Sequence, residues 1–328
     1  MSSVSSRAAQ LPQAATASRF DRAWRLYCRR VQRCRTENQT NRLHLIIENY
    51  MTPMDVHRFG AALANERDDA PGRAWIGRLA SRLPAKTVRA VEFDRIGPRK
   101  GFTLYAADTG SHAKKTLIVG FAGHFHRLMV PMPVLLDCLN PAFYDVVILR
   151  DFARLFFARG IDGLGGDFVE TMSSLRERFD FGSYRNVIAL GTSSGGLPAL
   201  LAAIMLRLDR GVSLGAIDFP VLAARLRNHG IRATAHAELL AARPQPFPEL
   251  ILAYGAHYGI DVASTKALHD RVPSRLHAVE KCDTHNLFAW HMARGKLPAF
   301  LQTLLAQDLE TGQPAASSPC AAGFDSTT

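Results

Sequence analysis

A serine between two glycines is the part of this chain best suited to covalent chemistry. Residues 191–195 read Gly-Thr-Ser-Ser-Gly and follow an apolar run at residues 187–190, which has the length of a buried strand. An apolar helical pattern then continues over about residues 197–208. The order strand, G-x-S-x-G, helix is typical of a nucleophile elbow, in which Ser193 stands clear of the sheet and the N–H of Ser194 faces the carbonyl under attack.

Glycine is needed on both sides of the serine if the turn is this sharp. A side chain two residues before or after the nucleophile would collide with neighbouring backbone, and Gly191 and Gly195 avoid that collision. A phosphate-binding loop is disfavoured, since neither Gly-Lys-Ser/Thr nor G-x-G-x-x-G is present. Ser194 is a weaker nucleophile candidate, because Thr192 would then stand where a small residue is required. The alternative interpretation of residues 191–195 is a tight turn without catalytic function, which has the same five residue types.

The elements that must position this serine alternate between strands and helices. Eight strands are predicted, at residues 88–93, 102–107, 116–121, 146–149, 187–190, 213–219, 249–254 and 275–279, the first two as a hairpin turned at 97–101. Helices are predicted at about 167–178, 197–208, 262–271 and 286–305, with two short ones within 221–248. This alternation predicts a mostly parallel sheet covered on both faces. A barrel would need a helix after the first strands as well.

With these elements in place, the chain resembles the α/β-hydrolase family over roughly residues 88–305, through the elbow and the order of the elements around it. In that family the nucleophile follows the fifth strand, the acid usually follows the seventh and the histidine follows the eighth, in the chain order Ser, acid, His. The resemblance therefore implies a triad of Ser193, Asp261 and His285. His285 would take the serine proton and return it to the leaving group, while Asp261 would hold the imidazole in the right tautomer.

The resemblance also implies a second oxyanion donor in the loop after the third strand, which reads Phe-Ala-Gly-His-Phe-His at residues 121–126. This loop lacks the HGGG of many lipases, and Gly123 and His124 are its best donor candidates, beside Ser194 in the elbow. The candidate substrate-binding residues are Phe125 in this loop and His257 after the seventh strand.

Other residues compete for the place of the acid. Asp218 follows the sixth strand, where some hydrolases carry it, and Asp261 would also serve as the cap of a helix starting at Val262. We favour Asp261 as the acid. Asp283, two residues before His285, is either an orienting partner of the imidazole or a surface residue.

Composition limits the class of protein. The chain has 328 residues, of which 47% are hydrophobic, and no apolar run approaches the ~18 residues that cross a bilayer. The first 20 residues lack the apolar core of a secretory signal. The cysteines are odd in number and scattered without a C-x-x-C, at Cys28, Cys34, Cys138, Cys282 and Cys320. These features indicate a reducing, cytoplasmic location without disulfides. Because the histidines lack metal-site spacing, neither a metal nor another cofactor is expected.

The segment before the sheet is predicted to be helical and basic. Residues Arg19–Arg35 contain seven arginines, interleaved with Phe20, Trp24, Tyr27 and Val31 on one helical face. One interpretation is contact with an anionic surface. Packing of this face on the main domain, with solvated arginines outside, is favoured. Thr52-Pro53-Met54-Asp55 predicts a second helix start, and about 74–83 a further short helix.

The predicted organisation is a disordered N-terminus (1–18), a helical extension (19–87), an α/β-hydrolase domain (88–306) and a flexible tail (307–328). The net charge of +11 permits acidic partners, but such arginine-rich composition is also common without them, so no nucleic acid partner is expected. The oligomeric state is not predicted.

Three functions are compatible with these residues. The favoured one is a serine hydrolase, carboxylesterase-like, that cleaves an acyl ester or thioester through an acyl-enzyme. The second is an acyltransferase using the same triad on a sugar or polysaccharide-related acceptor, and the third is a binding module without catalysis. The segment between the sixth and seventh strands spans only about 30 residues and carries several arginines, which weighs against a lipase lid. A modest acyl ester or an acylated polar molecule is therefore the expected substrate.

Overall fold

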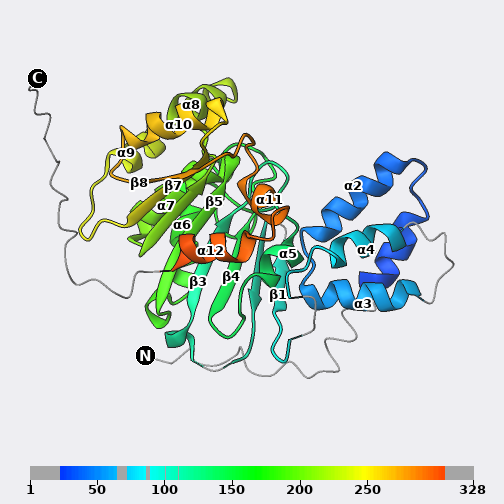
Figure 1. The fold of residues 1–328 in the computed structure, drawn as a ribbon. Coiled ribbons are helices and arrows are strands. Elements are labelled where there is room, and N and C mark those ends of the chain that lie inside the picture. Colours follow the sequence, from blue (N-terminus) through cyan, green and yellow to red (C-terminus); the bar gives the residue numbers. More distant parts are fainter. Residues whose placement is uncertain (1–22, 65–71, 86–88, 100, 110, 307–328) are drawn as a thin grey trace, which may run out of the picture.

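The computed structural model describes residues 23–64, 72–85, 89–99, 101–109 and 111–306. These residues form one sheet with helices on both faces, and a group of helices from the start of the chain lies beside it (Figure 1). The segments 1–18 and 307–328, predicted to be disordered, lie outside the described residues.

The sheet has eight strands in the order β1-β2-β4-β3-β5-β6-β7-β8. They are β1 (Asp94–Arg99), β2 (Phe102–Ala106), β3 (Thr116–Phe121), β4 (Tyr144–Leu149), β5 (Asn186–Thr192), β6 (Arg210–Leu214), β7 (Glu249–Gly255) and β8 (Arg275–Val279). β2 is antiparallel to both β1 and β4, whereas β4, β3 and β5 to β8 are parallel. The prediction of a mostly parallel, eight-stranded sheet is confirmed.

The helices alternate with the strands from β3 onward. They are α2 (Glu37–Glu48), α3 (Pro53–Ala64), α4 (Arg73–Ala80), α5 (Met132–Asp137), α6 (Phe168–Arg178), α7 (Gly196–Leu206), α8 (Phe219–Asn228), α9 (Thr234–Ala241), α10 (Gly259–His269), α11 (Leu287–Met292) and α12 (Leu297–Leu305). Residues 23–31 are also helical. Three short 3₁₀ turns complete the order: η1 (His112–Lys114), η2 (Phe181–Ser183) and η3 (Ser193–Gly195).

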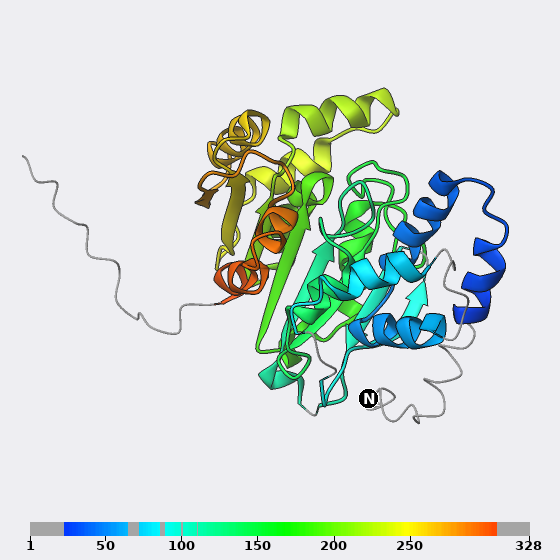
Figure 2. The same ribbon diagram turned by 45° about the vertical axis from the view of Figure 1, so that its right-hand side comes forward.

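The two faces of the sheet bury two separate apolar cores, because successive side chains of a strand point to opposite faces. On β3, Ile118 belongs to the core covered by α5, α11, α12 and the N-terminal helices. Its neighbours Leu117 and Val119 belong to the core covered by α6, α7, α8 and α10. Figure 2 shows the helices on either side of the sheet. All six residues of β3 are buried, which explains why this strand is so apolar.

The helices before the sheet form a unit held together by aromatic side chains. Tyr27 packs with its ring centroid 5.5 Å from that of Phe59 and 5.8 Å from that of Trp75, on α3 and α4. The apolar face of residues 23–31 therefore packs on these helices, with the nearby arginines exposed, rather than directly on the sheet. Phe20 and Arg19, at the start of the predicted helix, lie outside the described residues. Contact of its arginines with an anionic surface stays a prediction.

The start of α3 has the predicted capping geometry. The N–H of Asp55 donates to Thr52 Oγ1 at 3.2 Å, and the N–H of Thr52 donates to an Asp55 carboxylate oxygen at 2.8 Å. The helix α2 was not predicted, although Thr36 caps it by accepting from the N–H of Gln39 at 3.2 Å.

Three predicted elements differ most from the structure. The first strand does not lie at 88–93 but at Asp94–Arg99, and the chain through Gly97 continues it where a turn was predicted. β6 ends at Leu214 instead of continuing to residue 219, because Gly215 has a φ of +57° and Asp218 caps the next helix. The predicted helix 286–305 is interrupted at Gly295, whose φ is +66°, and forms α11 and α12.

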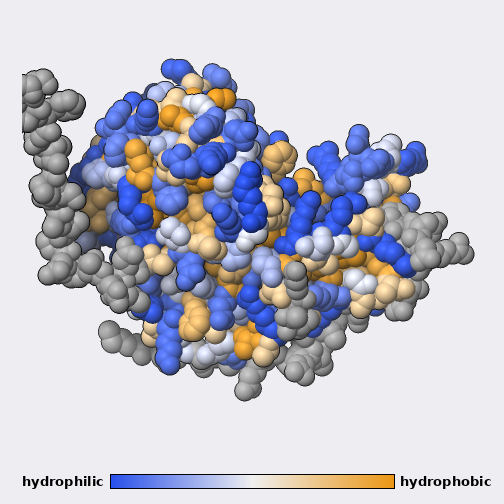
Figure 3. Space-filling view, in the orientation of Figure 1, coloured by the Kyte–Doolittle hydropathy of each residue, from blue (hydrophilic) through white to orange (hydrophobic). Residues whose placement is uncertain are grey.

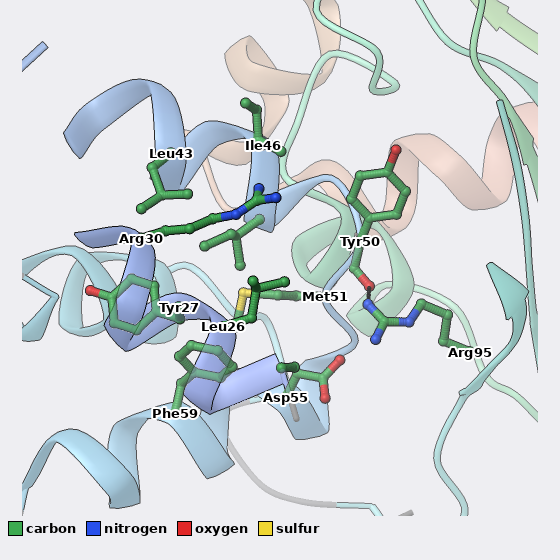
Figure 4. A pocket seen from close by; sticks show the side chains of 12 residues that line it. Leu26, Tyr27, Arg30, Leu43, Ile46, Tyr50, Met51, Asp55, Phe59 and Arg95 are labelled. Atoms are coloured by element: carbon green, nitrogen blue, oxygen red, sulfur yellow. Dashed lines mark hydrogen bonds between the residues drawn. The ribbon is translucent and has the colours of Figure 1, made fainter. Parts of the chain in front are cut away.

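An apolar cavity of about 320 Å³ lies within the N-terminal unit (Figure 4). Leu26, Leu43, Ile46, Met51 and Phe59 contribute to its walls, among others. At one side Arg95 donates to the carbonyl oxygen of Tyr50 at 2.8 Å, which ties this unit to β1.

Hydrophilic residues cover much of the face drawn in Figure 3, with hydrophobic residues scattered among them. Within the described ranges, no helix combines the length and apolar character required to cross a membrane.

We predict that His44, in the N-terminal unit, makes the stability of the protein decrease as the pH falls below neutral. This side chain is buried, stacks on Trp75 at 4.1 Å between ring centroids, and has its pKa lowered from 6.5 to about 4, mainly by burial. The unfolded chain binds the extra proton between these two pH values, so the free energy of unfolding falls as the pH decreases from 6.5 to 4. Chemical denaturation at several pH values measures this slope.

His44→Phe keeps an aromatic ring against Trp75 but cannot titrate, and the slope of stability between pH 6.5 and 4 should be smaller in this variant. The exposed His229 provides the control, since His229→Phe should leave the slope as in the wild type. An unchanged slope in His44→Phe would contradict the assignment.

Candidate active site

The serine of the elbow sits at a strained backbone position. Ser193 follows β5 directly as the first residue of η3, and its φ is +53°. A non-glycine residue in this region costs about 1–2 kcal/mol, and such strain is concentrated at functional sites. The strand, turn and helix predicted around Ser193 are therefore present as β5, η3 and α7.

The two glycines of the motif meet backbone at distances that exclude a side chain. A Cβ at Gly191 would lie 2.1 Å from the carbonyl oxygen of Gly195, and a Cβ at Gly195 would lie 2.2 Å from that of Phe121. The second contact presses the elbow against the end of β3. The turn at Ser193 is possible because neither glycine has a Cβ atom, which agrees with the collisions predicted from the sequence.

Asp261 and His285 are hydrogen-bonded to one another. His285 Nδ1 lies 2.9 Å from Asp261 Oδ1 and 3.0 Å from Oδ2. The Asp261 side chain is 2% exposed in the first turn of α10, and that of His285 is 36% exposed in the loop after β8. Since both carboxylate oxygens face Nδ1, the proton of a neutral imidazole belongs there, and Nε2 is free to accept one.

The three acidic residues considered for the triad, Asp261, Asp218 and Asp283, have different surroundings in the structure. Asp261 does not cap its helix, which begins at Gly259 after Tyr258 as N-cap. Asp218 instead caps α8, where its Oδ1 accepts from the N–H of Val221 at 3.0 Å. Asp283 is exposed at the surface.

Gly215 is part of this arrangement and was not predicted. It directly follows β6 with a φ of +57°, and a Cβ there would lie 2.8 Å from Asp261 Oδ2 and 2.8 Å from His285 Cε1. The Asp–His pair thus packs against bare backbone. The sequence did carry a signal for Gly215, a glycine at the end of an apolar run. It was overlooked because the predicted strand 213–219 included this glycine.

Ser193 and His285 line one cavity of about 230 Å³. The other lining residues are Gly123, His124, Phe125, Arg127, Met129, Thr192 and Asn286. Of the predicted substrate-binding residues, Phe125 lies here and His257 does not. His257 is exposed, and its N–H donates to the carbonyl oxygen of Cys282 at 2.9 Å. Arg127 and Met129 were missed because only the fold brings their loop over Ser193.

In the loop after β3, one of the two predicted oxyanion donors is already used in another hydrogen bond. The N–H of Gly123 donates to the carbonyl oxygen of Arg127 at 3.1 Å and is therefore engaged. Gly123 instead permits close approach, since a Cβ there would lie 3.0 Å from the carbonyl oxygen of Thr192. The N–H of His124 donates none of the hydrogen bonds found among the described residues. Ser194 lies in the first turn of η3, where backbone N–H groups lack intrahelical partners.

Electrostatics around this loop favour neutral imidazoles. Burial lowers the pKa of His124, and the positive charges of Arg225 and Arg154 lower it further. Burial also lowers the pKa of His126, with Arg154 and Arg150 acting in the same direction. In the part of the chain that the structure describes, no three His, Cys, Asp or Glu side chains gather as a metal site would require.

The strand order, with parallel strands from β4 onward and helices between them, is that of the α/β-hydrolase fold. No family model and no curated protein matches this chain. Similar solved structures include an α/β-hydrolase enzyme from a sediment metagenome of the Mar Chica lagoon, Morocco, at 21% identity and a TM-score of 0.41, covering 65% of this chain and 96% of that one.

A dienelactone hydrolase from Anabaena variabilis is 13% identical, with a TM-score of 0.43 and coverage of 66% of this chain and 97% of that chain. An esterase from Pyrococcus furiosus is 12% identical, with a TM-score of 0.42 and coverage of 66% and 94%. The sheet of this chain and the strand, turn and helix around Ser193 themselves show the fold.

We predict that Gly191→Ala destabilises the protein by about 1–3 kcal/mol or more, because the added methyl group overlaps the Gly195 carbonyl and the turn must open. Urea unfolding followed by circular dichroism measures the change. Gly60→Ala is the matched control. It lies inside α3, where the added Cβ would meet no atom within 4 Å apart from the nearby backbone of its own helix, and it should stabilise the protein by up to about 1 kcal/mol. Equal effects of the two substitutions would contradict the steric argument.

Proposed function

We propose that this protein is a serine hydrolase that cleaves an acyl ester or thioester through Ser193, His285 and Asp261. The observation that carries the proposal is that His285, hydrogen-bonded to Asp261, lines one cavity with a serine held in an elbow. These three side chains come from the segments that follow three different strands, and each has the chemical type that acyl transfer requires.

In the proposed reaction, Ser193 Oγ attacks the acyl carbonyl while its proton moves to His285 Nε2. Asp261 stabilises the imidazolium from the Nδ1 side. The bond from the carbonyl carbon to the leaving oxygen or sulfur then breaks, and the leaving group takes the proton from His285. A water molecule then attacks the acyl-serine and gives a proton to the same nitrogen. The bond from the acyl carbon to Ser193 Oγ breaks, Oγ takes that proton back from His285, and the acid is released.

The negative charge on the carbonyl oxygen needs donors during both steps. The N–H groups of Ser194 and His124 are the proposed oxyanion hole, since the Gly123 N–H is engaged elsewhere. Each such donor typically contributes about 10²–10³ in rate.

The cavity supports a modest substrate. About 230 Å³ is below the ~300–1,000 Å³ of pockets for drug-sized ligands, so a short acyl group fits better than a long chain. Between β6 and β7 the chain forms α8 and α9, which bury Leu222, Leu226 and Leu240 in the core. These helices pack as part of the domain, which supports an esterase-like activity over a lipase.

A fluorophosphonate probe tests the nucleophile directly. We expect the wild-type protein to be labelled, and both Ser193→Ala and His285→Ala to lose the labelling while they remain folded by circular dichroism. Absence of labelling in folded wild-type protein would overturn the proposal. If product from an acyl donor formed only after addition of an alcohol acceptor, an acyltransferase on the same triad would be favoured instead.

Asp261→Asn should lower kcat for a short-chain p-nitrophenyl ester by about 10³–10⁴-fold, because the wrong imidazole tautomer would face the serine. Asp218→Asn is the matched control and should retain activity within about 2-fold, since asparagine also caps helices well. A large loss in Asp218→Asn with an active Asp261→Asn would assign the acid to residue 218.

A further inference from the structure

We propose that the helices before the sheet position the oxyanion loop, and that Asn49 is the main positioning residue. The oxyanion loop is defined here as residues 122–129, between β3 and α5. This inference rests on the proposed function, because it concerns the geometry of the same site. It assigns a role to the helical segment at the start of the chain, which the reaction itself does not use.

Asn49 contacts the oxyanion loop directly. It is the C-cap of α2 and is 4% exposed. Its Nδ2 donates to the carbonyl oxygen of Phe125 at 2.9 Å, across 76 positions of sequence. That carbonyl belongs to the residue after His124, so the bond restrains the peptide units beside the proposed donor. The Phe125 side chain itself is 65% exposed and gives the loop little apolar anchorage.

The backbone of Asn49 is held in turn by the sheet. Its carbonyl oxygen accepts from Tyr105 Oη on β2 at 3.3 Å and from Nη2 of Arg150 after β4. Arg150 is buried, and its Nε donates to the carbonyl oxygen of His126 at 3.1 Å. One guanidinium therefore joins the end of α2 to the oxyanion loop. The Cζ atom of Arg150 also lies 4.4 Å from the centre of the Tyr50 ring.

A second connection runs from α2 to the far side of the same loop. Glu48 Oε2 accepts from Arg127 Nη1 at 3.1 Å, and its Oε1 accepts from Trp75 Nε1 on α4 at 2.7 Å. Both charged side chains are mostly buried, at 14% and 21% exposed, which limits solvent screening. Glu48 at the end of α2 and its C-cap Asn49 thus hold the loop at two points, Arg127 and Phe125.

Asparagine is a costly choice for position 49 unless this contact matters. Its Oδ1 is buried without a hydrogen-bond partner among the described residues, which typically costs about 1–3 kcal/mol. A buried apolar side chain would avoid that cost but could not hold the Phe125 carbonyl. Oxyanion stabilisation requires donors placed about 2.7–3.1 Å from the developing charge, so small movements of the loop have large effects on rate.

The test compares Asn49→Ala with the wild type and with Asn41→Ala, an exposed asparagine on the same helix. Kinetics with a short-chain p-nitrophenyl ester should show kcat about 10–100-fold lower in Asn49→Ala, with KM within about 2-fold. The fluorophosphonate labelling rate should fall by a similar factor, since its phosphoryl oxygen uses the same hole. The apparent pKa in the pH profile of kcat/KM should not move, because His285 and Asp261 are untouched. Asn41→Ala should match the wild type.

Glu48→Gln is a second variant, which keeps the shape but removes the charge that faces Arg127. It should lower kcat by about 2- to 5-fold, and it provides the test if Asn49→Ala does not fold. Wild-type kcat in folded Asn49→Ala, or in Glu48→Gln where Asn49→Ala fails to fold, would overturn the positioning role even if the melting temperature falls. Failure of the wild type to label would instead overturn the proposed function.

Discussion

The architecture of the site depends on the close approach of backbone to backbone at the elbow. Gly195 lies against the end of β3 and Gly191 against Gly195, at distances that no Cβ permits. The same absence of side chains recurs at Gly215, where the end of β6 meets the Asp261–His285 pair. Three strand ends can therefore converge at one edge of the parallel sheet, where loops after neighbouring strands meet. The strain at Ser193 is sustained by this surrounding packing.

The sequence predicted best those elements whose identity is local. β3 and β8 were predicted to the residue, because each is an apolar or alternating run between clear breaks. The edge strand β1 was misplaced because pairing with β2 determines it: it contains Asp94, Arg95 and Pro98, which an isolated pattern would not favour in a strand. The break between α11 and α12 had a readable signal in Gly295 and Pro298, but the apolar periodicity on both sides obscured it.

The candidate site shows the same division. Ser193 was predicted from its own motif, and Asp261 and His285 were predicted from the order of strands in the family that the chain resembles. Arg127, Gly215 and Asn49 could not be found in this way, because their importance comes from neighbours far along the chain. The engaged N–H of Gly123 is likewise a property of the folded loop, since its acceptor is created only by the turn that follows.

The partners of Arg150 have a consequence for how this protein can vary. Among the described residues, its guanidinium donates to the main-chain carbonyls of Asn49 and His126, and to a side-chain oxygen, Thr103 Oγ1, at 2.9 Å. A main-chain acceptor is present whatever residue occupies the position, whereas a lysine in place of Arg150 would lack the planar set of donors that spans all three. The bond from Arg150 to the carbonyl oxygen of residue 126 therefore places no requirement on the side chain at position 126. At position 150, by contrast, it requires arginine.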